Sequence, residues 1–356
     1  MGDKVLGRMA YVDAMKGFSI FLVVFAHSLM NAERNIDSEF AYVINFCAYV
    51  AVPSFFFING FLYNHKSTLT PVKGILKKFK AYYVPFVGFS LFFWMFHNVF
   101  ARLHLTSEEA YSIIDYIKRF VLIFAGHMES ELNGPMWFLR ALLIMVCMYI
   151  FIEYAAYKIS NKTARYIVLT IVILVMFFVG KLGYVTKAYN LNRIFYSLSF
   201  FYMGILFRDF EVNKFIEAHR VVVFVVGMLV LIFVSCMFMG ALGQNVGFKD
   251  IAGSYFGITG IFALSMFPII QKSRFLKLLG NASLDIMSLH FLAFKLVSYI
   301  YIQIYDLDIT RLSEVPVLRN IHGLYFIPYV IVGISLCIAE YEIRQRICNR
   351  FFRKRK

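Results

Sequence analysis

Stretches of about twenty apolar residues recur along this chain from residue 17 to residue 343. A bilayer core of ~30 Å is crossed by roughly twenty helical residues, because each residue adds about 1.5 Å. Of the 356 residues, 60% are apolar and 16% are charged, whereas a soluble domain is about half apolar and a quarter charged. The pattern therefore predicts an all-α fold, a polytopic membrane helix bundle of about ten transmembrane helices.

The sixth of these helices is the weakest prediction, because it is short and polar at its start. A further segment, 111–126, is amphipathic and too charged to span, so it is expected to lie at the interface or to re-enter the membrane. No internal repeat is clear, and residues 1–356 are predicted to form a single domain with a basic tail, 344–356. The expected helices cover residues 10–30, 40–62, 82–101, 135–157, 165–183, 190–207, 220–241, 251–270, 281–303 and 323–343.

Basic residues are distributed unevenly between the two sides of the predicted bundle. Of the 36 Lys and Arg residues, 24 fall on the side of the N-terminus and 10 on the opposite side, while Arg140 and Lys295 lie within helices. The positive-inside rule then predicts cytoplasmic N- and C-termini in a multi-pass protein of the cell (inner or plasma) membrane. Membrane topology also accounts for the net charge of +15, so a nucleic-acid partner is not expected.

The potential metal ligands show no pattern typical of a metal site. The five cysteines contain no CxxC pair, and the spacing of His97, His104 and His127 suggests no metal site. We expect free thiols and no bound metal.

The first apolar segment contains three ionisable residues, Asp13, Lys16 and His27. Such residues cost ~2.5–3.5 kcal/mol each near the centre of a membrane helix on insertion scales, so they often mark functional positions. Lys16 and His27 are eleven residues apart, which places them about 20° apart around a helix with a rise of ~16 Å. Asp13 lies one turn before Lys16. Histidine suits proton transfer because its pKa is near neutrality; a packing role, hydrogen-bonded to another helix, is the alternative for His27.

Four motifs in order resemble the membrane-bound acyltransferase 3 family. The first is Arg8-x4-Asp13-x2-Lys16-Gly17-x9-His27, and the second is Pro53-Ser-Phe-Phe-Phe-Ile-Asn59-Gly60-Phe61-Leu62. The third is Pro135-Met-Trp137-Phe138-Leu139, and the fourth runs from Gly280 to His290 as Gly-Asn-Ala-Ser-Leu-Asp-Ile-Met-Ser-Leu-His. The third is similar to the fucose O-acetylase-like branch, whose members modify cell-envelope glycans.

The resemblance implies transfer of an acyl group, usually acetyl, from cytoplasmic acyl-CoA to a hydroxyl of a carbohydrate acceptor. It assigns His27 as the catalytic histidine and Lys16 as its basic partner, with Asp13 beside them. His27 could act as a general base or as a nucleophile that carries the acyl group, and the residues do not separate these mechanisms.

Further basic and aromatic residues are candidates for substrate contacts. Lys16, Lys77, Lys78 and Lys80 would bind the phosphates of acetyl-CoA or another acyl-CoA, although topology alone would also produce the last three. The predicted acceptor contacts are Asn59, Trp137 and Arg140. For His290 a structural role is favoured over a catalytic one.

Two other functional classes stay open at this point. A transporter or flippase of glycan or lipid-linked precursors would also have ten helices and intramembrane charges, but it predicts an inverted repeat with broken helices. A sensory or scaffold protein would not need Lys16 and His27 on the same face of a helix. The lipid bilayer is the expected surrounding, and the sequence says nothing about oligomeric state.

Overall fold

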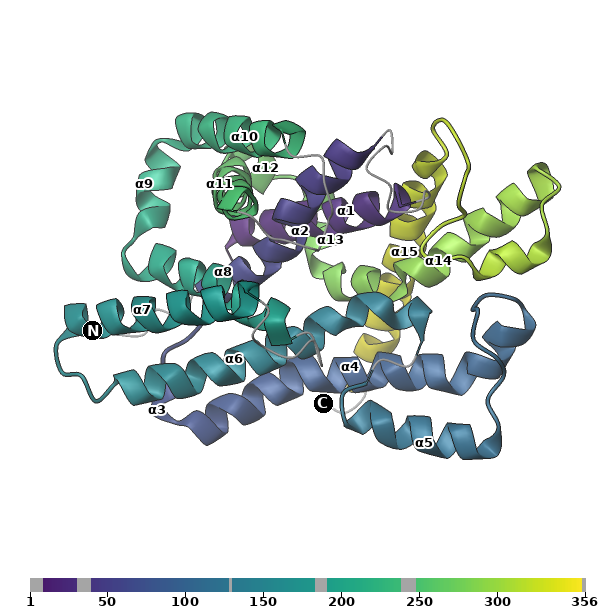
Figure 1. The fold of residues 1–356 in the computed structure, drawn as a ribbon, viewed down its shortest axis with the longest axis horizontal. Coiled ribbons are helices and arrows are strands. Elements are labelled where there is room, and N and C mark those ends of the chain that lie inside the picture. Colours follow the sequence, from purple (N-terminus) through teal and green to yellow (C-terminus); the bar gives the residue numbers. More distant parts are fainter. Residues whose placement is uncertain (1–8, 31–39, 128–129, 183–190, 238–247, 354–356) are drawn as a thin grey trace. The chain divides into compact units, whose positions relative to one another are not determined.

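The computed structural model describes residues 9–30, 40–127, 130–182, 191–237 and 248–353, and these residues are helical with short connections (Figure 1). Two short 3-10 helices, η1 and η3, complete the described elements. The helices are α1 Ala10–Ser28, α2 Ala41–Phe61, α3 Lys66–Leu69, α4 Pro71–Arg102, α5 Ile113–Phe124, η1 Glu131–Met136, α6 Trp137–Ala156, α7 Lys162–Lys181, α8 Leu191–Asp209, α9 Val212–Ala218, α10 Arg220–Met237, α11 Phe248–Ser265, α12 Pro268–Gln271, α13 Arg274–Asn281, α14 Ser283–Ile304, η3 Ile309–Ser313 and α15 Phe326–Arg353.

Each of the ten expected membrane segments corresponds to a helix, which confirms the all-α membrane bundle. Among the described residues, seven helices are long and apolar enough to cross a membrane: α1, α2, α4, η1 with α6, α7, α14 and α15. An eighth is obtained if α9 and α10, which meet at a 97° bend, are counted as one span. Ten is therefore an approximate count. The ends of three expected segments lie outside the described residues, at residues 183, 190 and 238–241. Arg8 of the first motif also lies outside them.

The chain forms two compact units. The first contains residues 1–55, 101–107 and 214–356, and the second contains residues 56–100 and 108–213. Helix α2 contributes its first part to one unit and its last turns to the other. The prediction of a single domain over residues 1–356 stays a prediction.

Two glycines bring α1 and α13 together in the first unit. A Cβ atom at Gly17 would collide with the backbone of Leu276, and one at Gly280 would collide with the backbone of Asp13. Only glycine therefore permits this helix contact, which fixes the first half of α1 against α13. Both glycines belong to the motifs found in the sequence.

The second unit uses a similar glycine contact between α2 and α8. A Cβ atom at Gly60 would collide with the Phe201 carbonyl, and one at Gly204 would collide with the Phe57 carbonyl. This contact fixes the end of α2, and with it the chain segment that leads into α4.

The amphipathic segment after α4 forms α5, a helix that doubles back beside α4 (Figure 1). Its first turn is held by a capping box between Ser112 and Asp115. The Trp94 indole of α4 donates a hydrogen bond to the Tyr116 carbonyl at 3.0 Å, and the Tyr83 hydroxyl donates to the Phe124 carbonyl at 2.7 Å. Helix α5 thus runs antiparallel to α4 from Trp94 to Tyr83, and its two expected placements, at the interface or re-entrant, stay predictions.

Candidate functional site

The predicted polar stripe lies on α1, which is one uninterrupted helix from Ala10 to Ser28. The regular helix preserves the spacing of Lys16 and His27 derived above, about 20° apart with a rise of ~16 Å. Asp13 is buried, whereas Lys16 and His27 are partly exposed. Asp13 also lines a small cavity of about 100 Å³ together with Lys277 of α13.

His27 meets a second histidine, His290 of α14. The His27 Nδ1 atom lies 2.9 Å from His290 Nε2, and the two ring planes are nearly parallel, at an angle of 14° with centroids 5.1 Å apart. Phe291 covers the His27 ring edge-on at a centroid distance of 4.9 Å. The structure thus gives the histidine of the first motif a direct partner in the fourth motif.

The hydrogens of this pair follow from its partners. His290 Nδ1 lies 2.7 Å from the Ile286 carbonyl oxygen, which can only accept, so His290 Nδ1 carries a hydrogen. His290 is fully buried, and burial disfavours a charged ring. A neutral His290 then presents an acceptor at Nε2, to which His27 Nδ1–H donates. The remaining lone pair of His27 is consequently on Nε2, the atom that a base or nucleophile would use.

Lys295, the second basic residue within a helix, has a structural environment. Its Nζ donates hydrogen bonds to the carbonyls of Leu312 and Glu314, each at 2.7 Å, and the residue is 3% exposed. The Lys295 side chain therefore anchors η3 to α14.

The other predicted site residues lie in the second unit. Asn59 accepts a hydrogen bond at Oδ1 from the Tyr82 hydroxyl at 2.8 Å, and the Arg193 guanidinium lies 5.6 Å from the Trp137 ring centroid. Arg140 Nη1 donates to the Gly126 carbonyl at 2.6 Å. Arg140 and Tyr82 line one cavity, so Asn59 is joined to that cavity through Tyr82.

The three predicted donor-binding lysines lie on the first turns of α4. Lys77 and Lys80 are exposed, and Lys78 is partly exposed with its Nζ 5.7 Å from the Tyr82 ring centroid. Their exposure allows them to contact an anionic ligand.

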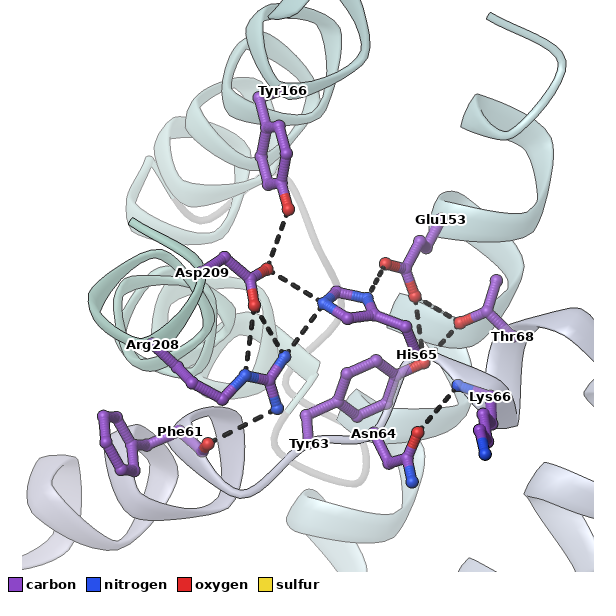
Figure 2. Close-up of polar contacts among 10 residues, drawn as sticks. All are labelled: Phe61, Tyr63, Asn64, His65, Lys66, Thr68, Glu153, Tyr166, Arg208 and Asp209. Carbon is purple, nitrogen blue, oxygen red and sulfur yellow. Dashed lines mark hydrogen bonds and ion pairs between the residues drawn. The ribbon is translucent and has the colours of Figure 1, made fainter. Parts of the chain in front are cut away.

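The second unit also contains a polar cluster centred on His65, which follows α2 (Figure 2). His65 Nδ1 is hydrogen-bonded to Glu153 of α6, and His65 Nε2 lies 2.9 Å from Asp209 Oδ2 of α8. The Arg208 guanidinium binds the other oxygen of Asp209 through Nε at 3.0 Å and Nη2 at 2.8 Å. We call these residues, with Tyr63, Thr68 and Tyr166, the His65 cluster.

The remaining members of the His65 cluster complete the coordination of the two carboxylates. Tyr63 donates to Glu153 Oε2 at 3.1 Å, and Thr68 donates to the same oxygen. Tyr166 donates to Asp209 Oδ2 at 2.8 Å, as Figure 2 shows. The cluster therefore ties the segment between α2 and α4 to α6, α7 and α8.

The charge of His65 is set by its two carboxylate partners. Burial lowers the pKa of His65, but the hydrogen bonds to Asp209 and Glu153 outweigh it and raise this pKa to about 9. Burial likewise opposes the charge of Asp209, while His65 and Arg208 together lower the pKa of that carboxyl to about 2. The raised pKa favours the imidazolium form of His65 at neutral pH. Arg208 Nη2, 2.8 Å from His65 Nε2, is then a like-charged neighbour, and the Asp209 carboxylate that binds both groups offsets the repulsion.

No sequence motif predicts the His65 cluster. The sequence features that could have indicated this cluster are Glu153, at the end of an apolar helix, and the adjacent opposite charges of Arg208 and Asp209. Within the described residues, no group of three or more His, Cys, Asp or Glu side chains is arranged to hold a metal ion.

The fold is an apolar helical bundle in which a histidine pair joins α1 and α14. The family model for the acyltransferase 3 domain, described as an acyltransferase domain, matches residues 9–341. The chain therefore belongs to the acyltransferase 3 family and is a membrane acyltransferase. No curated protein and no solved structure matches the chain.

Proposed function

We propose that this acyltransferase moves an acyl group, specifically acetyl, from cytoplasmic acyl-CoA to a hydroxyl of a cell-envelope glycan or its precursor. Support comes from the family membership, from the four motifs and from the histidine pair on α1 and α14. The observation that carries the proposal is the hydrogen-bond chain Ile286–His290–His27, which leaves the lone pair of His27 on Nε2.

As a general base, His27 Nε2 removes the proton of the acceptor hydroxyl while its oxygen attacks the thioester carbonyl. The thiolate of CoA then leaves and takes the proton back from the imidazolium. During this step His290 Nε2 accepts from His27 Nδ1–H and stabilises the positive charge, as the orienting group of a catalytic triad does. The nucleophilic alternative uses the same Nε2 lone pair and forms an acyl-imidazole first.

The proposal assigns supporting roles to the other predicted residues. Lys16, with Asp13 one turn away, supplies positive charge on the same face of α1 as His27. Lys77, Lys78 and Lys80 bind the donor phosphates from the start of α4, and Asn59 and Trp137 contact the acceptor. Both termini are proposed to be cytoplasmic, and the protein is proposed to act in the inner or plasma membrane on polysaccharide.

Transfer of label from acetyl-CoA to envelope glycan, measured in isolated membranes, tests the proposal. Wild type and the control His322→Gln, which changes an exposed histidine, are expected to label the glycan equally. His27→Ala, inserted at the wild-type level, is expected to leave the glycan unlabelled. Wild-type labelling by His27→Ala would refute the catalytic role, and glycan movement across the membrane by the wild type without a donor would support a transporter instead.

A brief exposure to labelled acetyl-CoA without acceptor separates the two mechanisms. Label that stays on the protein in the wild type, and is absent from His27→Ala, indicates an acyl-histidine. Absence of label from a wild-type protein that completes transfer when acceptor is added indicates general-base catalysis.

A further inference from the structure

A cavity of about 350 Å³ lies within the second unit, formed by α4, α6, the first residue of α8 and the turn after α5. Its volume falls within the range of ~300–1,000 Å³ typical of small-molecule sites. Phe79, Tyr82, Tyr83 and Phe86 of α4 form one wall, and Leu143 of α6 is part of the facing wall. The lining is therefore aromatic and aliphatic for most of its area.

The two tyrosine hydroxyls of this wall are engaged with the protein. Tyr82 donates to Asn59, and Tyr83 donates to the carbonyl of Phe124. A sugar ring has several hydroxyls, and each one buried without a hydrogen-bond partner would cost free energy. The walls therefore suit a hydrocarbon chain better than a carbohydrate.

Arg140 is the charged residue of this lining. Its Nη1 donates to the carbonyl of Gly126, whose φ of +83° is a backbone conformation that glycine adopts readily. The turn after α5 thus fixes the orientation of the guanidinium. Guanidinium stays protonated at every physiological pH, and its planar fork matches a phosphate better than any neutral group.

We propose that this cavity binds the hydrocarbon chain of an anionic membrane lipid, with the lipid phosphate against Arg140. A hydrocarbon wall beside one fixed cation is complementary to an amphiphile with one anionic group, and lipid is the amphiphile that surrounds a membrane protein. The assignment gives Arg140 a lipid phosphate as its partner, in place of the sugar predicted from the sequence. It does not depend on acyl transfer or on His27.

The test uses full-length protein in nanodiscs of phosphatidylcholine with a minor fraction of phosphatidylglycerol. After transfer to detergent, native mass spectrometry counts and identifies the lipids that each protein molecule retains. Wild type is expected to retain one phosphatidylglycerol, enriched about tenfold over its share of the nanodisc, since charge-assisted contacts are the strong ones. Arg140→Gln is expected to lose the enrichment, and Leu143→Phe, which fills the cavity, to lose the retained lipid.

Two surface changes on α15 serve as matched controls. Arg346→Gln removes an exposed guanidinium, and Leu336→Phe enlarges an exposed leucine, so both are expected to retain lipid as the wild type does. Wild-type retention by Leu143→Phe, or undiminished enrichment in Arg140→Gln, would overturn the proposal, provided that both variants elute as wild type in size exclusion. If the retained lipid has the same composition as the nanodisc, it is surface lipid only and the proposal is wrong. If acyl-CoA displaces the lipid, the cavity belongs to the acyl donor and the proposal is also wrong.

Discussion

Two histidines of this protein are held in opposite chemical environments. His27 has a neutral partner, His290, which is itself anchored to a backbone carbonyl. His65 lies between two carboxylates, Glu153 and Asp209, and is therefore held as a cation. The comparison shows that hydrogen-bond partners decide what an imidazole can do: His27 retains a lone pair that the proposed proton transfer would use, whereas His65 is a charged link between helices.

The largest expected effect is on turnover when His27 is changed. His27→Gln removes the base and is expected to lower kcat by about 10²–10⁴-fold, the usual contribution of general acid–base catalysis. Its melting temperature in detergent is expected to stay near that of the wild type, because a polar side chain remains beside His290. A kcat within a factor of three of wild type would show that the His27 environment is structural.

The next effect concerns the orientation of His27. His290→Phe removes the acceptor for His27 Nδ1–H while keeping a ring of similar size, and kcat is expected to fall by about 10²-fold because the tautomer is no longer fixed. His290→Gln keeps a possible acceptor and is expected to retain more activity. A pH–rate profile measured for both variants checks this order, since a purely structural His290 would lower the amount of folded protein without changing the profile.

The His65 cluster is expected to respond in stability. Glu153→Gln removes the charge that accepts hydrogen bonds from His65, Tyr63 and Thr68. Hydrogen bonds to charged groups contribute about 1.5–3 kcal/mol, so the melting temperature is expected to fall while kcat at saturating substrate changes little. An unchanged melting temperature in this variant would contradict the role of the cluster as a link between helices.

The smallest effect is a pH dependence of stability. The folded-state pKa of His65, about 9, lies above the unfolded value near 6.5, so its contribution is complete below pH ~6.5 and is lost as pH rises through about 9. The melting-temperature difference between wild type and His65→Gln is expected to shrink from pH 6 to pH 10. A melting-temperature difference that grows from pH 6 to pH 10 would mean that His65 is neutral in the folded protein. The control is His322→Gln, which changes an exposed histidine.

Local features of this fold follow directly from the sequence. The apolar segments predict the helices, because hydropathy and helix length depend on neighbouring residues, and the stripe from Lys16 to His27 needs only a regular α1. The resemblance of the motifs to the acyltransferase 3 family is confirmed by the family model, whereas the fucose O-acetylase-like branch stays a prediction.

The partners of the two histidines could not be predicted in the same way. His290 is 263 residues from His27, and the His65 cluster joins residues from four separate chain segments. Such contacts depend on helix packing, which close approaches at glycines such as Gly17 and Gly60 control. The sequence favours a structural role for His290 because nothing local distinguishes a packing histidine from one that orients a base.

The tautomer of His27 is the most direct test of this account. In protein labelled with ¹⁵N-histidine and reconstituted in lipid, solid-state NMR distinguishes protonated from unprotonated ring nitrogens, and His27→Gln and His290→Gln assign the signals. The account predicts that neutral His27 carries its hydrogen on Nδ1 and that Nε2 is unprotonated. A neutral His27 with its hydrogen on Nε2 would contradict the proposed base.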